Sequence, residues 1–110
     1  MIKRINILDP VTDEPVDSIP IRISYIVLKK TQTKTKKLLT QATEADFDLY
    51  EELLWQAYEE GSKAVDEKKK YERKELDSLM DSCYYEFVAT IPEFFPKQKP
   101  YPQQSGKKGK

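Results

Sequence analysis

Apolar side chains recur at alternating intervals of three and four residues through two long stretches of the chain, and this spacing limits the fold more than any other feature. The first stretch, residues 47–65, carries Phe47, Tyr50, Leu53, Leu54, Ala57, Tyr58, Gly61, Ala64 and Val65. The second, residues 76–91, carries Leu76, Leu79, Met80, Cys83, Phe87 and Ile91. Such spacing places side chains on one face of an α-helix, so both stretches predict amphipathic helices. The exposed face of the first helix would hold Asp48, Glu52, Gln56, Glu59 and Lys63.

The N-terminal part of the chain opposes helix formation. Prolines at positions 10, 15 and 20 rule out a helix there, because proline lacks an N–H donor and its ring clashes with the preceding turn. Residues 1–8 alternate weakly, and turn-forming residues follow at 9–15, so a short β element is expected. Residues 21–39 fit either a strand or a helix. Our interpretation is a short strand near 19–22 and a helix over about 23–38.

The C-terminal segment differs in composition from the rest of the chain. Pro92 ends the second apolar stretch, and residues from 97 onward are rich in Lys, Pro, Gln and Gly. Such a composition is typical of a disordered tail. We therefore predict one mainly α domain over residues 1–95, with about three helices and a short N-terminal β element. Residues 96–110 would form a flexible tail.

The residues that most enzymes use are scarce. The chain has no histidine, and its single cysteine, Cys83, falls on the apolar stripe between Met80 and Phe87. A Ser-His or Cys-His pair is therefore excluded, and Cys83 is expected to be a buried, unreactive side chain. Carboxylates adjacent in sequence, as at 51–52 and 59–60, point in different directions on a helix and do not converge. We predict a protein that is not an enzyme and has no cofactor, metal site or small-molecule substrate.

Charge is unevenly distributed along the chain. Residues 97–110 contain five lysines and no acid, which leaves 14 basic and 19 acidic side chains, a net charge of −5, in the rest. An acidic body makes a nucleic-acid-binding regulator a weaker interpretation. No apolar run approaches the ~20 residues of a membrane span, and residues 1–6 do not resemble a signal peptide. We expect a cytoplasmic protein without a membrane partner.

Four aromatic residues are candidate contacts with a partner or with further copies of the chain. Trp55 and Tyr85 lie away from the centres of their apolar stripes, and Phe94 and Phe95 follow Pro92. Tryptophan and tyrosine are enriched where protein surfaces meet. The alternative is that the first helix or the N-terminal strand covers Trp55, which would make it a core residue. Tyr85 could simply be exposed.

Two segments carry a resemblance to a known family. Residues 50–61 read YEELLWQAYEEG, and residues 74–81, after a charged interval, read KELDSLMD. With the preceding β element and helix, this order resembles the tail assembly chaperones of long-tailed, siphovirus-type bacteriophages that infect Gram-positive hosts such as lactococci. The resemblance covers about residues 20–95. The Thr/Lys-rich run at 29–37 and the Lys/Pro-rich tail depart from the family pattern.

The resemblance implies a function in virion morphogenesis. Such chaperones bind the tape measure protein, a long helical rod with apolar stripes, and keep it soluble while tail tube protein assembles around it. The chain would then act in the host cytoplasm as a homo-oligomer, a ring or a helical array, and be absent from the mature virion. The alternative is a small structural or adaptor protein, such as a head–tail connector or scaffold piece, that stays in the particle.

Overall fold

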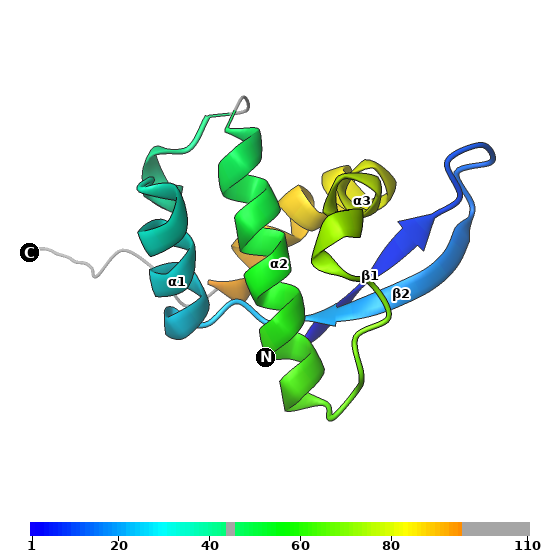
Figure 1. The fold of residues 1–110 in the computed structure, drawn as a ribbon, viewed down its shortest axis with the longest axis horizontal. Helices are drawn as coiled ribbons and strands as arrows, with labels where there is room; N and C mark the ends of the chain where they lie inside the picture. The colour runs from blue at the N-terminus through cyan, green and yellow to red at the C-terminus, as the bar shows by residue number, and fades with distance from the viewer. Residues whose placement is uncertain (44–45, 96–110) are drawn as a thin grey trace, which may run out of the picture.

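The computed structural model describes residues 1–43 and 46–95 (Figure 1). In chain order its elements are β1 (Lys3–Leu8), β2 (Pro15–Ile21), α1 (Tyr25–Thr35), the short 3-10 helix η1 (Leu39–Gln41), α2 (Phe47–Ala64), η2 (Arg73–Glu75), α3 (Leu76–Thr90) and η3 (Ile91–Phe94). The prediction of a mainly helical domain with a small N-terminal β element is confirmed. The tail predicted at 96–110 lies outside the described residues.

β1 and β2 form an antiparallel hairpin in which Lys3 pairs with Ile21 and Ile5 with Ile19. Ile5 and Ile7 of β1 are buried, as are Ile19 and Ile21 of β2. Because side chains alternate between the two faces of a strand, these isoleucines share the face that covers the core.

Hydrogen bonds to Asp9 stabilise the turn between the strands. Its carboxylate accepts bonds from the backbone N–H groups of Val11 at 2.8 Å and Thr12 at 3.1 Å. Its own N–H donates to the carbonyl of Glu14 at 2.8 Å. The two bonds to the carboxylate favour its ionised form and lower the pKa of Asp9.

The second strand begins at Pro15, earlier than the predicted 19–22. In the described part of the chain it pairs only with β1, so one of its edges has no strand partner. A proline tolerates such an edge position, because its missing N–H removes no inter-strand bond there. The three prolines therefore exclude a helix, as predicted, but do not shorten the strand.

The ambiguous segment after β2 is a helix, but a shorter one than predicted. α1 spans Tyr25–Thr35 and ends at Lys36, whose φ of 63° places it in the left-handed region. From there the Lys36 N–H donates to the carbonyl of Gln32 at 2.7 Å. This closing bond ends the helix before the predicted residue 38 and leaves Leu38 and Leu39 in the connection to α2.

α2 lies between α1 and the other elements (Figure 1), where it packs against α1, β2 and α3. It therefore has more than one buried face. Glu52 and Gln56, which we placed on the exposed face, are 5% and 7% exposed. Conversely Phe47, predicted in the apolar stripe, is 58% exposed. A single stripe describes a helix packed on one side, whereas α2 is covered from several directions.

Candidate functional site

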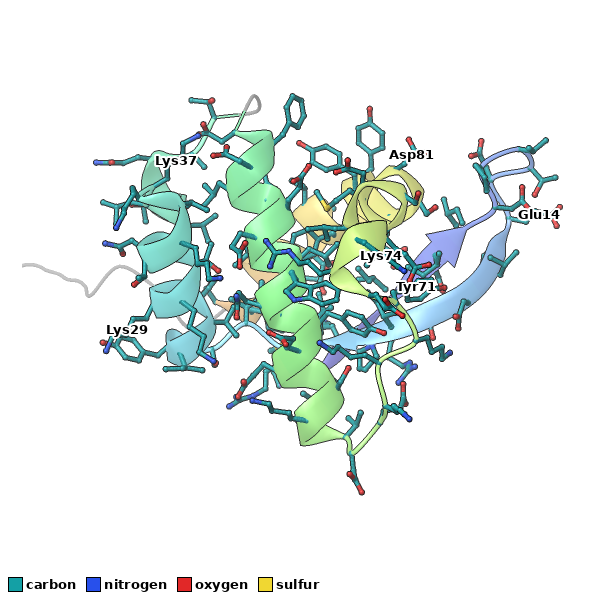
Figure 2. The ribbon with its side chains drawn as sticks, in the orientation of Figure 1. Glu14, Lys29, Lys37, Tyr71, Lys74 and Asp81 are labelled. Atoms are coloured by element: carbon teal, nitrogen blue, oxygen red, sulfur yellow. The ribbon has the colours of Figure 1, made fainter. Side chains whose placement is uncertain are left out.

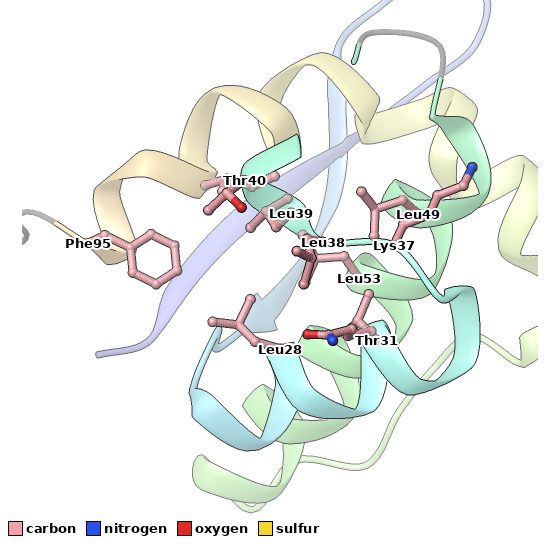
Figure 3. A pocket seen from close by; sticks show the side chains of 11 residues that line it. Leu28, Thr31, Lys37, Leu38, Leu39, Thr40, Leu49, Leu53 and Phe95 are labelled. Carbon is pink, nitrogen blue, oxygen red and sulfur yellow. The ribbon is translucent and has the colours of Figure 1, made fainter. Parts of the chain in front are cut away.

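A pocket of about 600 Å³ opens between α1, the connection to α2 and the N-terminal half of α2 (Figure 3). Its apolar lining consists of Leu28, Leu38, Leu39, Leu49, Leu53, Ile91 and Phe95. Phe95 lies at one end, and Leu49 and Lys37 lie at the other (Figure 3). We call this feature the leucine groove. Its size and lining are typical of sites that accept apolar side chains.

The groove exists because of two local features of the sequence. Thr31, a small residue on the inner side of α1, lines the groove, and its buried hydroxyl has no hydrogen-bond partner among the described residues. The helix also ends at Lys36, so Leu38 and Leu39 are presented from a non-helical connection. Leu38 is 41% exposed, which leaves apolar surface facing solvent at the mouth of the groove.

Lys37 attaches the groove's connecting segment to the start of α2. Its ammonium group lies 2.8 Å from Oδ1 of Asp48 and 3.2 Å from Oδ1 of Asp46. Hydrogen bonds to these two carboxylates raise the pKa of Lys37. Because this cation is already paired with two acids, the groove is better suited to an apolar ligand than to an anionic one.

Trp55, a predicted partner contact, is a core residue with 7% exposure. Its ring packs edge-on to that of Tyr58, with centroids 5.8 Å apart. The ammonium group of Lys69 lies 4.4 Å from the Trp55 ring centroid, and the Arg73 guanidinium lies on the same ring. Trp55 is thus buried within the chain, as in the alternative interpretation, and two of the groups that lie over its ring come from residues 65–75.

Polar contacts hold that covering segment, residues 65–75, in place. The Tyr58 hydroxyl accepts a bond from the N–H of Lys70 at 2.7 Å. Asp17 of β2 accepts bonds from the Lys70 ammonium at 2.7 Å and from the Tyr71 hydroxyl at 3.0 Å. Burial and the bond to Asp17 raise the pKa of Tyr71 to about 12, so its hydroxyl remains a donor at neutral pH. The charged run in residues 65–75 is thus held against the domain by these bonds and packs over Trp55.

Glu52 forms a buried polar cluster beside Trp55. Its carboxylate accepts a bond from the Gln56 amide at 2.6 Å and is paired with the Arg73 guanidinium through both oxygens. Burial acts to raise the pKa of Glu52, but the bonds from Arg73 and Gln56 outweigh it and the pKa is lowered. At neutral pH the Glu52 carboxylate is therefore ionised and bonded to both Arg73 and Gln56.

Replacing Arg73 with alanine should destabilise the domain by about 2 kcal/mol at neutral pH, because Glu52 would lose its charged donor in a buried site. A lowered folded-state pKa contributes stability above the unfolded-state pKa, and this contribution is lost as pH falls through the folded-state value. The difference between Arg73→Ala and the native protein should therefore shrink on acidification. Urea unfolding at a series of pH values tests this, with the exposed neighbour Lys74→Ala as control. Equal stabilities at neutral pH would contradict it.

The other candidate residues occupy different parts of the surface. Tyr85 on α3 is 87% exposed. Phe94 and Phe95 are half-buried against the core, and Phe95 also lines the leucine groove. Cys83 is buried, as predicted, and burial raises the pKa of its thiol to about 12. Of the four predicted contacts, only Phe95 joins the groove. For the other residues of the groove, the signal in the sequence was the Leu38-Leu39 pair, which follows a Lys/Thr-rich stretch.

Comparison with models of known protein families found no match, and no curated protein or solved structure matches the chain significantly. Across residues 1–43 and 46–95, no helix is long and apolar enough to cross a membrane. Nor does that part of the chain contain a group of three or more histidine, cysteine, aspartate or glutamate residues arranged to hold a metal ion.

Proposed function

We propose that the protein is a non-enzymatic tail assembly chaperone that binds apolar helical segments of a tape measure protein in the leucine groove. The observation that carries this proposal is the open, leucine-lined space between α1 and α2. The resemblance of residues 50–61 and 74–81 to phage tail assembly chaperones supplies the kind of client. In this proposal the protein acts in the host cytoplasm and does not stay in the finished virion.

The groove suits an amphipathic helix by its chemistry. A helix binds to an apolar groove by inserting side chains spaced at i, i+3, i+4 and i+7. Each fully buried leucine or phenylalanine contributes about 1.5–3 kcal/mol relative to its exposed state. A long helical rod exposes many such side chains and aggregates through them. Covering these side chains in turn would keep the rod soluble.

Self-association is the second part of the proposal. One copy of a 110-residue chain can cover only a short length of a long rod, so many copies must lie side by side on it. Repeated contacts between unlike surfaces close into rings or continue as helices. Together such copies bind a repetitive client more tightly than one copy does. Tail tube protein would then displace the coat during assembly.

Introducing a charge at the mouth of the groove tests client binding. Leu38→Asp should leave the fold intact, since Leu38 is 41% exposed, but place a carboxylate where an apolar side chain must bind. Co-expression with a tape measure segment should then yield several-fold less soluble client than the native chain does. Val11→Asp is the matched control, because Val11 is 87% exposed in the hairpin turn, outside the groove.

If both variants keep the client soluble as well as the native chain does, the groove is not the client site. Mass spectrometry of purified virions separates the chaperone from the alternative of a structural or adaptor protein. A chaperone should be absent or present in traces, whereas a connector or scaffold piece that stays in the particle should be present in fixed stoichiometry.

A further inference from the structure

The outer side of α3 and the start of α2 form an exposed aromatic surface. The Tyr84 ring lies 6.1 Å from that of Phe47, 6.2 Å from that of Tyr50 and 5.4 Å from that of Tyr85, measured between centroids. Tyr85 is 87% exposed and Phe47 58% exposed. Rings that pack on one another in this way are rigid, so little conformational entropy is lost when a partner covers them.

Acidic side chains accompany these rings on α3. Residues 47–62 and 76–94 contain no lysine or arginine, and α3 carries Asp77 and Asp81, whereas its Glu86 accepts a bond from the N–H of Asn6 on β1. Asp81 lies one helical turn before Tyr84 and Tyr85, on the α3 side of the molecule (Figure 2). Neither Asp77 nor Asp81 forms an ion pair within the described residues. We call this region, rings and carboxylates together, the acidic face.

A carboxylate on α2 adds to the excess of negative charge on α3. Burial, and then the charge of Asp77, raise the pKa of Glu51 on α2. Carboxylates that repel one another in this way are stabilised by a cation brought to them. The acidic face therefore favours a partner that carries positive charge and some apolar surface.

The outer side of α1 has those two properties. Lys29, Lys30 and Lys34 are exposed, and none forms an ion pair in the described part of the chain. Tyr25 and Ile26, one turn earlier, are 77% and 40% exposed. Ile26 and the three lysines line a shallow hollow of about 400 Å³ against Gln56 and Glu59 of α2, and Glu59 is paired with Lys69. We call this region the basic face.

The two faces lie on opposite sides of the molecule. α1 and α3 flank α2 (Figure 1), and Lys29 lies far from Asp81 across the molecule (Figure 2). One copy cannot bring its own two faces together, but two copies can. The basic face uses residues of α1 other than those in the leucine groove, so both surfaces can be occupied at once.

We propose that the acidic face of one copy binds the basic face of the next, so that the chain assembles head to tail. The lysine ammonium groups of the basic face would pair with Asp77 and Asp81 and lie against the tyrosine rings, while Tyr25 and Ile26 pack beside Tyr85. Because the two surfaces differ, an assembly of any length keeps one acidic face and one basic face free at its two ends. This inference rests on the proposed self-association and names the surfaces that carry it.

Complementary charge reversal tests the assignment in the full-length chain. Asp77→Lys/Asp81→Lys makes both faces basic, and Lys29→Glu/Lys30→Glu makes both acidic. Each variant alone should associate at least about tenfold more weakly than the native chain in sedimentation experiments, because like charges then meet. An equimolar mixture should associate again, and added salt should weaken both the mixture and the native assembly.

Two further variants separate the contact from general charge effects. Lys63→Glu/Lys68→Glu changes the net charge as much as Lys29→Glu/Lys30→Glu does, but at exposed positions outside both faces, and should associate as the native chain does. Tyr85→Ala should weaken association without changing the helix content measured by circular dichroism. The proposal is supported if association recovers in the mixture of charge-reversed variants, the Lys63→Glu/Lys68→Glu variant associates normally and the Tyr85→Ala variant associates more weakly.

Two results would overturn it, and they have different consequences. Oligomers that persist unchanged in all face variants would show that copies meet elsewhere, while the proposed self-association stands. If the native chain remains monomeric at high concentration, both the proposed contact between the two faces and the proposed self-association are wrong. Client solubilisation by the Leu38→Asp variant is measured separately, so the groove assignment is judged on its own result.

Discussion

Replacing Phe87 with aspartate should unfold the protein. Phe87 is fully buried on α3, and Leu54 of α2, also fully buried, belongs to the same core. Removing a large core side chain costs about 3–5 kcal/mol, and a buried charge without a partner adds several more. The total approaches the roughly 5–15 kcal/mol that stabilises a whole domain. Leu54→Asp should have the same effect, because it places a carboxylate in the same core.

Circular dichroism and urea unfolding measure this outcome. The matched control is Tyr85→Asp, which introduces the same charge two residues away on the same helix, at a position that is 87% exposed. This control should change stability by about 1 kcal/mol or less, as surface substitutions usually do. A soluble Phe87→Asp variant with a cooperative unfolding transition near that of the control would mean that α3 buries a different face.

The helices and the β element could be predicted because their signals are local. The stripes at 47–65 and 76–91 correspond to α2 and α3, and Pro92 falls just after α3 ends. The end of α1 could not be placed, since it depends on the left-handed conformation of Lys36, a residue with no special preference for it. The Thr/Lys-rich run extends over residues 29–37, across this point, so composition does not mark the boundary.

The surroundings of α2 could not be predicted because they depend on residues distant in sequence. Arg73 and Gln56 satisfy the buried carboxylate of Glu52, and Lys69 of residues 65–75 lies over the Trp55 ring. A periodic pattern shows which residues share a helix face but not how many elements pack on that helix. The leucine groove was missed for the same reason, since its walls come from α1, its connection, α2 and the region after α3.

Gly61 shows how close packing can imitate a helix-ending signal. Glycine is common just past the end of a helix, yet α2 continues through Gly61 to Ala64. The left-handed residue is instead Asp66, with φ of 56°. Gly61 serves the contact between α2 and β2. A Cβ atom added to it would lie 2.4 Å from the carbonyl oxygen of Pro20 and 2.7 Å from Cα of Ile21.

Any side chain at position 61 should therefore force α2 away from β2. The obstructing atoms belong to the backbone, so no side-chain rotation can relieve the overlap. In an exposed helix, replacing glycine with alanine would stabilise by about 1 kcal/mol through helix propensity. Here Gly61→Ala should instead destabilise by about 2 kcal/mol, because overpacking typically costs 1–3 kcal/mol and occasionally more. Gly61→Val should cost more still, since it adds further atoms to the same overlap.

Thermal and urea unfolding of Gly61→Ala, Gly61→Val and the control Lys63→Ala measure this series. Lys63 is exposed on the same helix, so its replacement should alter the free energy of unfolding by no more than about 0.5 kcal/mol. The Arg22 N–H donates to the carbonyl of Ala57 at 3.1 Å, one turn before Gly61, so amide hydrogen exchange at Arg22 reports directly on the separation of α2 from β2. It should accelerate in the Gly61 variants and stay slow in the control. A Gly61→Ala protein more stable than the native chain would show that α2 and β2 do not approach as closely as this contact requires.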